Sequence, residues 1–110
     1  MVIEIKMTND QVFQLARMLS ELREFTPVSK DAKLFTSIGI ELYDKVDAKA
    51  KKIHLKSSLF DEKKKHKFTF KYHQALALQF IIQGLLPTLF NLHTKTIMNA
   101  LLGTINQKLA

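Results

Sequence analysis

Residues 68–87 read FTFKYHQALALQFIIQGLLP, and this stretch decides the fold. Phe68, Phe70 and Tyr72 alternate with Thr69 and Lys71, which is typical of a strand with one buried face. The side chains that follow are nearly all apolar, and the exceptions are glutamines. Such a dense apolar block is typical of a buried helix. The stretch therefore predicts a strand that leads, at about residue 73, into a central helix with neighbours on most of its sides.

The N-terminus follows the same plan of a strand and then a helix. Ile3, Ile5 and Met7 alternate with Glu4 and Lys6 over residues 2–7. Two lone strands with matched apolar faces are expected to pair in a small sheet that helices cover on one side. The alternation leaves open whether the two strands run parallel or antiparallel.

Sequence signals for the starts and ends of helices predict two helices between the two strands. Thr8 and Gln11 have the spacing of a capping box, so a helix is predicted from there to about Phe25, before Pro27. Apolar residues spaced by three and four predict a second helix over residues 30–53. Gly39 lies inside this helix at a cost of about 1 kcal/mol relative to alanine, which a close approach of another helix would explain.

The C-terminal third predicts two further helices. The central helix is expected to reach about Leu86, and the last helix to begin with Thr94 as its cap. Residues 87–93 are either a linker or the first turn of that helix, with Pro87 at its first position.

The segment over residues 54–66 is ambiguous. Either the long helix ends near Lys56 and a loop leads to the strand predicted over residues 67–72, or residues 57–60 form a short strand paired with it. The charged run over residues 61–67 favours the loop.

Together these elements predict an α+β fold that is mostly helical. About four helices should surround one core, with two short strands forming a minimal sheet, and residues 1–110 should make a single domain. The chain has three glycines and two prolines, so its loops should be few or short. It has no cysteine, no N-terminal signal pattern and no apolar run long enough to span a membrane, and we expect a cytoplasmic protein without a membrane partner.

The positive charge is concentrated in one segment. Residues 45–71 contain ten lysines against three acidic residues, which equals the net charge of +7 of the whole chain. Such a segment attracts phosphate backbones. Phe60, Phe68 and Tyr72 could then stack on bases, but the alternation of Phe68 and Tyr72 favours packing in the core. The candidate nucleic-acid-binding residues are Lys49, Lys52, Lys63, Lys64, Lys65 and Lys67.

The C-terminal third is unusually apolar for so small a chain. Either the central helix is simply surrounded by the other elements, or part of this apolar surface is exposed and used for self-association as a homodimer. The candidate self-association residues are Leu78, Ile82, Leu89, Phe90, Leu102 and Leu109.

No constellation of residues indicates an enzyme. The serines lack a Gly-rich turn, the glycines are far apart, and no two of the four histidines are spaced as a helical metal site requires. We predict no catalytic residue, no metal, no cofactor and no small-molecule substrate. The sequence favours a non-enzymatic protein-interaction or scaffold domain that self-associates, and the alternative is a protein that binds the backbone of nucleic acids through residues 45–71.

Overall fold

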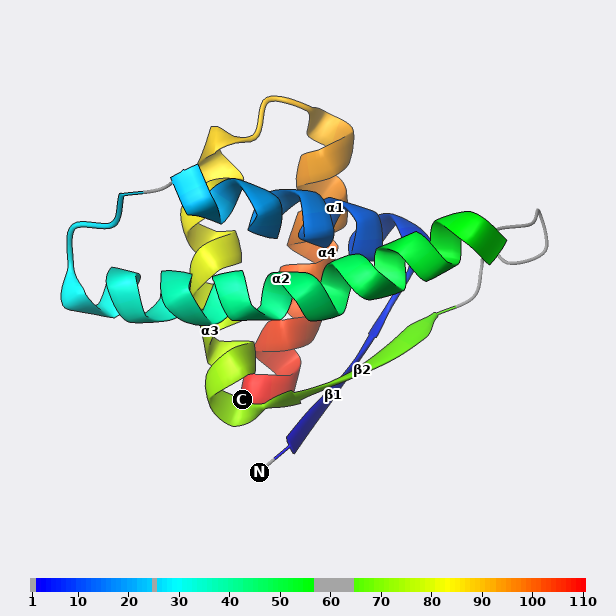
Figure 1. Cartoon of the computed structure of the whole chain (residues 1–110), viewed down its shortest axis with the longest axis horizontal. Helices are drawn as coiled ribbons and strands as arrows, with labels where there is room; N and C mark the ends of the chain where they lie inside the picture. Colours follow the sequence, from blue (N-terminus) through cyan, green and yellow to red (C-terminus); the bar gives the residue numbers. More distant parts are fainter. Residues whose placement is uncertain (1, 25, 57–64) are drawn as a thin grey trace.

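The computed structural model describes residues 2–24, 26–56 and 65–110. These residues form four α-helices, two 3-10 turns and two strands, in the order β1 (Val2–Met7), α1 (Asn9–Ser20), η1 (Glu21–Glu24), α2 (Lys30–Lys56), β2 (His66–Lys71), α3 (Tyr72–Leu85), η3 (Leu86–Thr88) and α4 (Leu92–Leu109). The predicted α+β class is therefore confirmed. Figure 1 shows α1 and α2 side by side, crossing α3 and α4 behind them, with the two strands running across one end of the helices.

The two strands pair antiparallel, which decides the direction that the sequence left open. Ile5 lies opposite Phe68 and Ile3 opposite Phe70, and these four side chains are buried against the helices. Val2, Glu4 and Lys6 of β1 lie on the outer face. The sheet thus buries one face and leaves the other to solvent, as the alternation predicts.

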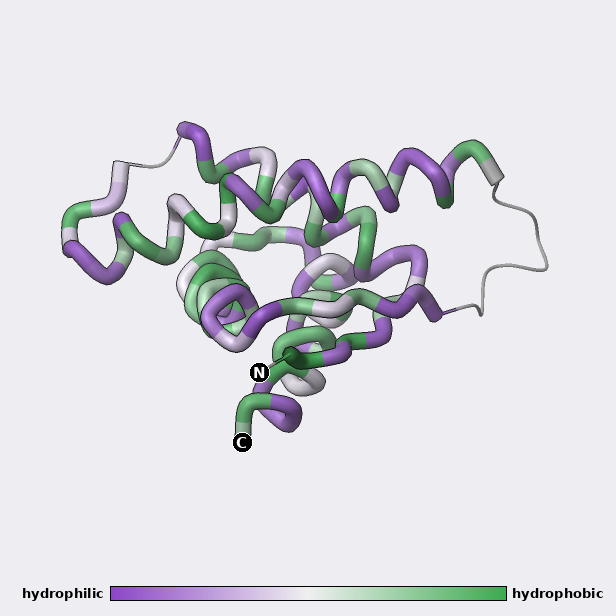
Figure 2. The backbone as a smooth tube through the Cα atoms, turned by 60° about the horizontal axis from the view of Figure 1, so that its bottom comes forward, coloured by the Kyte–Doolittle hydropathy of each residue, from purple (hydrophilic) through white to green (hydrophobic). Residues whose placement is uncertain are grey.

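α3 is the centre of the core. Its buried residues are spread around the helix and not along one stripe, because α2 lies on one side of it and α4 on another. Figure 2 shows α3 as mostly hydrophobic, whereas hydrophilic and hydrophobic residues are mixed along α1 and α2. The buried residues of α3 are Ala75, Ala77, Leu78, Ile81, Ile82 and Leu85.

Gly39 marks the closest approach of α2 to its neighbours. A Cβ atom at this position would lie 2.5 Å from Cδ1 of Ile81 and 2.6 Å from Cδ1 of Leu22. Contacts this short are not tolerated between carbon atoms, so with any other residue either the ends of the Ile81 and Leu22 side chains must move or α2 must shift away from α3 and η1. The expectation that another helix approaches this glycine is confirmed.

The helix ends differ in detail from those predicted. α1 ends at Ser20 and continues as the 3-10 turn η1, while α2 runs on to Lys56. The capping box of Thr8 and Gln11 is present. α4 begins earlier than predicted, because the side chain of Asn91, and not that of Thr94, caps it.

The sequence left two alternatives open, one for residues 57–60 and one for residues 87–93, and the structure decides the second. β2 begins at His66, and the predicted loop or strand over residues 57–60 lies outside the described residues. Pro87 lies in η3 and not in the first turn of α4, so the linker alternative for residues 87–93 is the correct one up to the cap at Asn91.

Candidate nucleic-acid interface

One face of α2 carries lysines and is turned toward β2. Lys45, Lys49 and Lys52 are spaced by four and three residues, so they lie on the same face of the helix. The ammonium of Lys45 donates a hydrogen bond to the backbone carbonyl of Thr69 and lies 4.8 Å from the centroid of the Phe70 ring. These contacts fix which side of α2 the lysines occupy.

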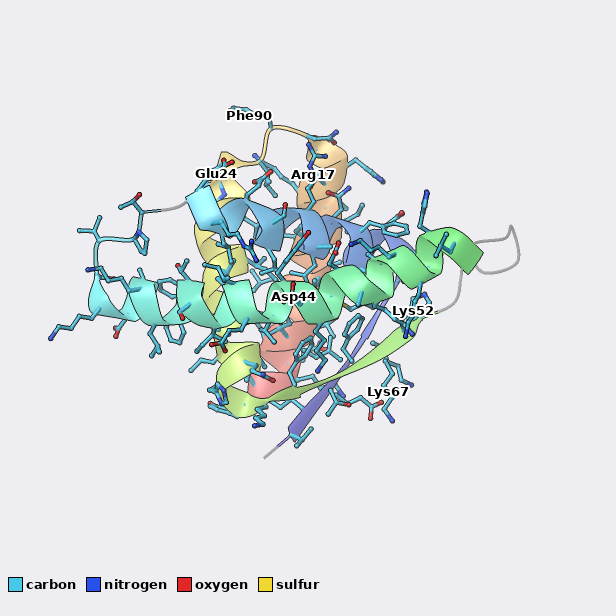
Figure 3. All side chains as sticks on the ribbon, in the orientation of Figure 1. Arg17, Glu24, Asp44, Lys52, Lys67 and Phe90 are labelled. Carbon is cyan, nitrogen blue, oxygen red and sulfur yellow. The ribbon has the colours of Figure 1, made fainter. Side chains whose placement is uncertain are left out.

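The direction of the chain brings the other lysines to the same end of the molecule. α2 runs toward Lys56, and β2 returns from His66, so the two elements pass each other in opposite directions at Lys45 and Thr69 (Figure 1). Lys49 and Lys52 therefore lie toward the beginning of β2, where Lys65 and Lys67 are found. Figure 3 shows Lys52 and Lys67 at this end, on α2 and on β2.

The outer face of the sheet adds a further lysine. The register places Lys6 directly opposite Lys67, and both side chains are exposed. Like charges in opposite positions of a sheet repel each other. Glu4 offsets part of this repulsion through an ion pair with Lys67, with 3.2 Å between Nζ and Oε2.

We call this region the lysine surface, and it consists of Lys6, Lys49, Lys52, Lys65 and Lys67. All are exposed except Lys49, which is partly covered. Four of them belong to the predicted set, while the predicted Lys63 and Lys64 lie outside the described residues. Lys6 was not predicted, although the alternation of residues 2–7 already placed it on the outer face of a strand.

Two neighbouring lysines do not belong to the lysine surface. The ammonium of Lys45 is engaged with β2. Lys51 lies on another face of α2 and forms an ion pair with Asp47 across one turn, with 3.0 Å between Nζ and Oδ2. The hydrogen bond that the Lys51 ammonium donates to Asp47, followed by the charge of that carboxylate, raises the pKa of Lys51. Both lysines are already paired, which separates them from the lysine surface.

The aromatic residues near the lysine surface are mostly in the core. Phe68 and Phe70 lie on the inner face of the sheet with their rings stacked at 5.8 Å, so the possibility that Phe68 stacks on bases is wrong and core packing is confirmed for it. Tyr72, the first residue of α3, is 43% exposed. Phe60 lies outside the described residues.

The predicted self-association residues are divided between core and surface. Leu78 and Ile82 are completely buried in the monomer and Leu102 is nearly so, and they cannot serve as an exposed contact. The prediction is corrected for these three residues, because α2, α4 and the sheet pack against α3, which carries Leu78 and Ile82, while α1, α3 and β1 pack against α4, which carries Leu102. Leu89 and Leu109 are partly buried. Phe90 is fully exposed on the connection between α3 and α4, where Figure 3 shows it at the edge of the molecule.

The hollows of the described surface hold no assembled catalytic group. A hollow of about 320 Å³ between α1 and the connection from α3 to α4 is lined by Arg17, Glu21, Phe90 and Asn91, among others. The side chain of Asn91 is occupied by the N–H groups of His93 and Thr94. A second hollow, of about 370 Å³, lies between residues 26–32 and the end of α3 and is largely apolar.

The described residues contain no group of three or more His, Asp or Glu side chains that could hold a metal ion. Of the helices in the described ranges, none is long and apolar enough to cross a membrane. Comparison with protein-family models, with curated proteins and with solved structures found no match to this chain.

Proposed function

We propose that this protein is a non-enzymatic binding domain that holds the phosphate backbone of a nucleic acid on its lysine surface. The observation that carries the proposal is the contact of Lys45 with Thr69 and Phe70, because it joins the lysine face of α2 to β2, the strand that carries Lys67 and that Lys65 directly precedes. Lysines from three separate elements, β1, α2 and β2, then act on one ligand.

The chemistry of the lysine surface agrees with backbone binding. Exposed ammonium groups neutralise phosphates and release their counterions, which supplies most of the free energy of non-specific binding. An ammonium is a point charge without the planar fork with which arginine reads guanine. The lysine surface therefore favours binding that does not depend on base sequence.

The experiment is a titration of a short fluorescent duplex at low salt, followed by fluorescence anisotropy. The test variant replaces Lys52, Lys65 and Lys67 with glutamine, and the control variant replaces Lys30, Lys33 and Lys108 in the same way. All six side chains are exposed, so both variants lose three positive charges without a change in the core. We expect the test variant to bind at least about tenfold more weakly than the control variant.

Two results would contradict the proposal. One is that the wild-type protein binds no nucleic acid at low salt. The other is that both variants bind equally weakly, because net charge and not the lysine surface would then be responsible.

Self-association is a second proposal, and it is favoured by Phe90. A fully exposed phenylalanine next to the exposed Leu92 is an unusual surface feature. In a twofold dimer each copy presents the same patch, so the contact would use Phe90 twice. We expect light scattering to give the mass of a dimer for the wild type and that of a monomer for Phe90→Ser. Val28→Ser, which alters an equally exposed apolar residue on another connection, should remain dimeric. A wild-type monomer at high concentration would contradict this proposal.

A further inference from the structure

We propose that the hollow between η1, the beginning of α2 and the end of α3 binds a small, neutral, aromatic molecule. The hollow has a volume of about 370 Å³. Thr36, in its wall, lies 13 residues before Lys49 on α2, which corresponds to about 20 Å along the helix axis. The hollow is therefore a different site from the lysine surface, and the inference does not depend on the proposed function.

The wall of the hollow is largely apolar and uncharged. Leu22 of η1, Ala32 of α2 and Ile81 of α3 are among its members, and every lining residue in the described ranges is neutral. Ligand sites in proteins are typically hollows of about 300–1,000 Å³ with apolar walls and a small number of polar groups. An ionised ligand would lose its hydration here without gaining a charged partner, so the wall favours a neutral one.

The wall contains one buried hydroxyl that has no partner within the chain. Thr36 is only 9% exposed, and its side chain forms no hydrogen bond in the part of the chain that the structure describes. Threonines in helices often donate to the carbonyl four residues earlier. Thr96 donates in this way to Leu92, and Thr104 to Ala100, whereas Thr36 makes no such bond to its own helix.

The hydroxyl of Thr36 is accessible from the hollow. Among the described residues, no side-chain oxygen is both sealed from solvent and without a hydrogen-bond partner. The oxygen of Thr36 therefore remains accessible although the residue as a whole is buried, and the hollow that Thr36 lines provides the access. A hydroxyl can donate or accept, so a ligand with one hydrogen-bonding group fits this wall.

Phe80 adds an aromatic ring to the wall. It is 41% exposed, and its ring lies 4.8 Å from that of Phe35, centroid to centroid. The exposed part of Phe80 can pair with a ring of the ligand, because offset and edge-to-face pairs are favourable. An apolar cavity of about 150 Å³ holds benzene, so the larger hollow has room for two fused rings. Indole has the required properties, since it is neutral, has two fused rings and carries one N–H donor.

The test is a titration of the ¹⁵N-labelled wild-type protein with indole, followed by NMR. We expect the backbone amide signals of Leu22, Thr36 and Gly84 to shift together and to saturate, because these residues come from the three elements that line the hollow. The signals of Lys49 and Lys52 should stay in place.

Two glycines provide a matched pair of variants. Gly84 lines the hollow, whereas Gly103 lies in α4, and a Cβ atom added at either position would meet nothing within 4 Å. Both positions therefore accept a larger side chain. Gly84→Leu should bind indole at least about tenfold more weakly, because the added side chain takes up part of the hollow. Gly103→Leu should bind indole as the wild type does.

Thr36→Val removes the hydroxyl and keeps the shape of the side chain. We expect this variant to bind indole about fivefold more weakly, because one hydrogen bond is lost. Its unfolding temperature should not fall, because the hydroxyl has no partner to lose in the described part of the chain. This second readout distinguishes a ligand-binding hydroxyl from one that only supports the fold.

Three results would overturn the inference. If indole causes no saturating shifts at Thr36 and Gly84, the hollow holds water only. If Gly84→Leu and Gly103→Leu weaken binding equally, the effect does not come from the hollow. If Thr36→Val unfolds at a lower temperature and binds indole unchanged, its hydroxyl serves the fold and not a ligand.

Discussion

The ammonium of Lys45 lies 4.8 Å from the centroid of the Phe70 ring, and that ring is completely buried on the inner face of the sheet. The same ammonium donates to the backbone carbonyl of Thr69. β2 is an edge strand, and unpaired carbonyls of edge strands invite pairing with another chain. Lys45 thus joins α2 to β2 and covers one polar group of an exposed edge.

Loss of this contact should weaken the fold. Lys45→Met keeps the length of the side chain but removes both the cation–π contact and the hydrogen bond, so we expect the free energy of unfolding to fall by about 1 kcal/mol. Urea denaturation followed by circular dichroism measures it. Lys51→Met is the control, because an exposed ion pair across one helical turn contributes little to the free energy of unfolding. Equal losses in the two variants would contradict the role of Lys45.

Gly39→Ala should destabilise the protein although alanine is the better helix former. The methyl group would meet Ile81 and Leu22, both buried, and overpacking a core costs about 1–3 kcal/mol, which outweighs the gain in helix propensity of about 1 kcal/mol. At Gly103, in α4, an added Cβ has no neighbour within 4 Å, so Gly103→Ala should instead stabilise by up to about 1 kcal/mol. Thermal unfolding compares the two. Stabilisation by both substitutions would show that the contact at Gly39 is not tight.

The cap of α4 gives a third prediction. The side chain of Asn91 accepts hydrogen bonds from the N–H groups of His93 and Thr94, at 2.8 and 3.3 Å. Asn91→Ala should lower the free energy of unfolding by about 1 kcal/mol, since these N–H groups lose their partner. Asn99→Ala, at an exposed position within α4, should be neutral or slightly stabilising. A neutral result for Asn91→Ala would place the cap elsewhere.

The fourth prediction separates the core from the surface in the C-terminal third. Leu78→Ala should cost about 3 kcal/mol, because the residue is completely buried and its removal leaves a cavity. Phe90→Ala should change the unfolding free energy of the monomer by less than about 0.5 kcal/mol. Chemical denaturation at low protein concentration tests both without interference from association. A large loss for Phe90→Ala would mean that its ring is covered.

The sequence predicted the pairing of the strands but not its direction. Ile3, Ile5, Phe68 and Phe70 fall on one face because successive residues of a strand point to opposite sides. That alternation is the same whether the strands run parallel or antiparallel. The direction depends on how α1 and α2 return the chain, which is a matter of packing between distant elements.

The candidate sites were predictable to different degrees. Hydrophobicity alone does not separate Leu78, which is buried, from Phe90, which is exposed, because α3 is apolar around most of its circumference. The charge density of the sequence located the basic segment at residues 45–71, but it could not show that Lys45 contacts β2 whereas Lys49 belongs to the lysine surface. Only the contact with Thr69 and Phe70 does so. Lys6 joins the lysine surface through the pairing register of β1 with β2, although it lies 61 residues before Lys67 in the chain.

The prediction that α4 begins with Thr94 as its cap is wrong for a local reason. Residues 87–94 contain several signals for a helix start, namely Pro87, Asn91 and Thr94. Each can satisfy part of a first turn, and the choice depends on the angle at which the chain leaves η3.

The lack of a side chain at residue 39 fixes where α2 crosses α3. A slip of α2 along its own axis by four residues, about 6 Å, would bring Phe35 or Tyr43 to the place where even a Cβ atom lies 2.5 Å from Ile81 and 2.6 Å from Leu22. The position of α2 along its axis is therefore locked, and with it the height at which Lys49 and Lys52 stand beside the sheet. Gly39, at the contact of α2 with α3, thus also determines where Lys49 and Lys52 of the same helix lie relative to the sheet.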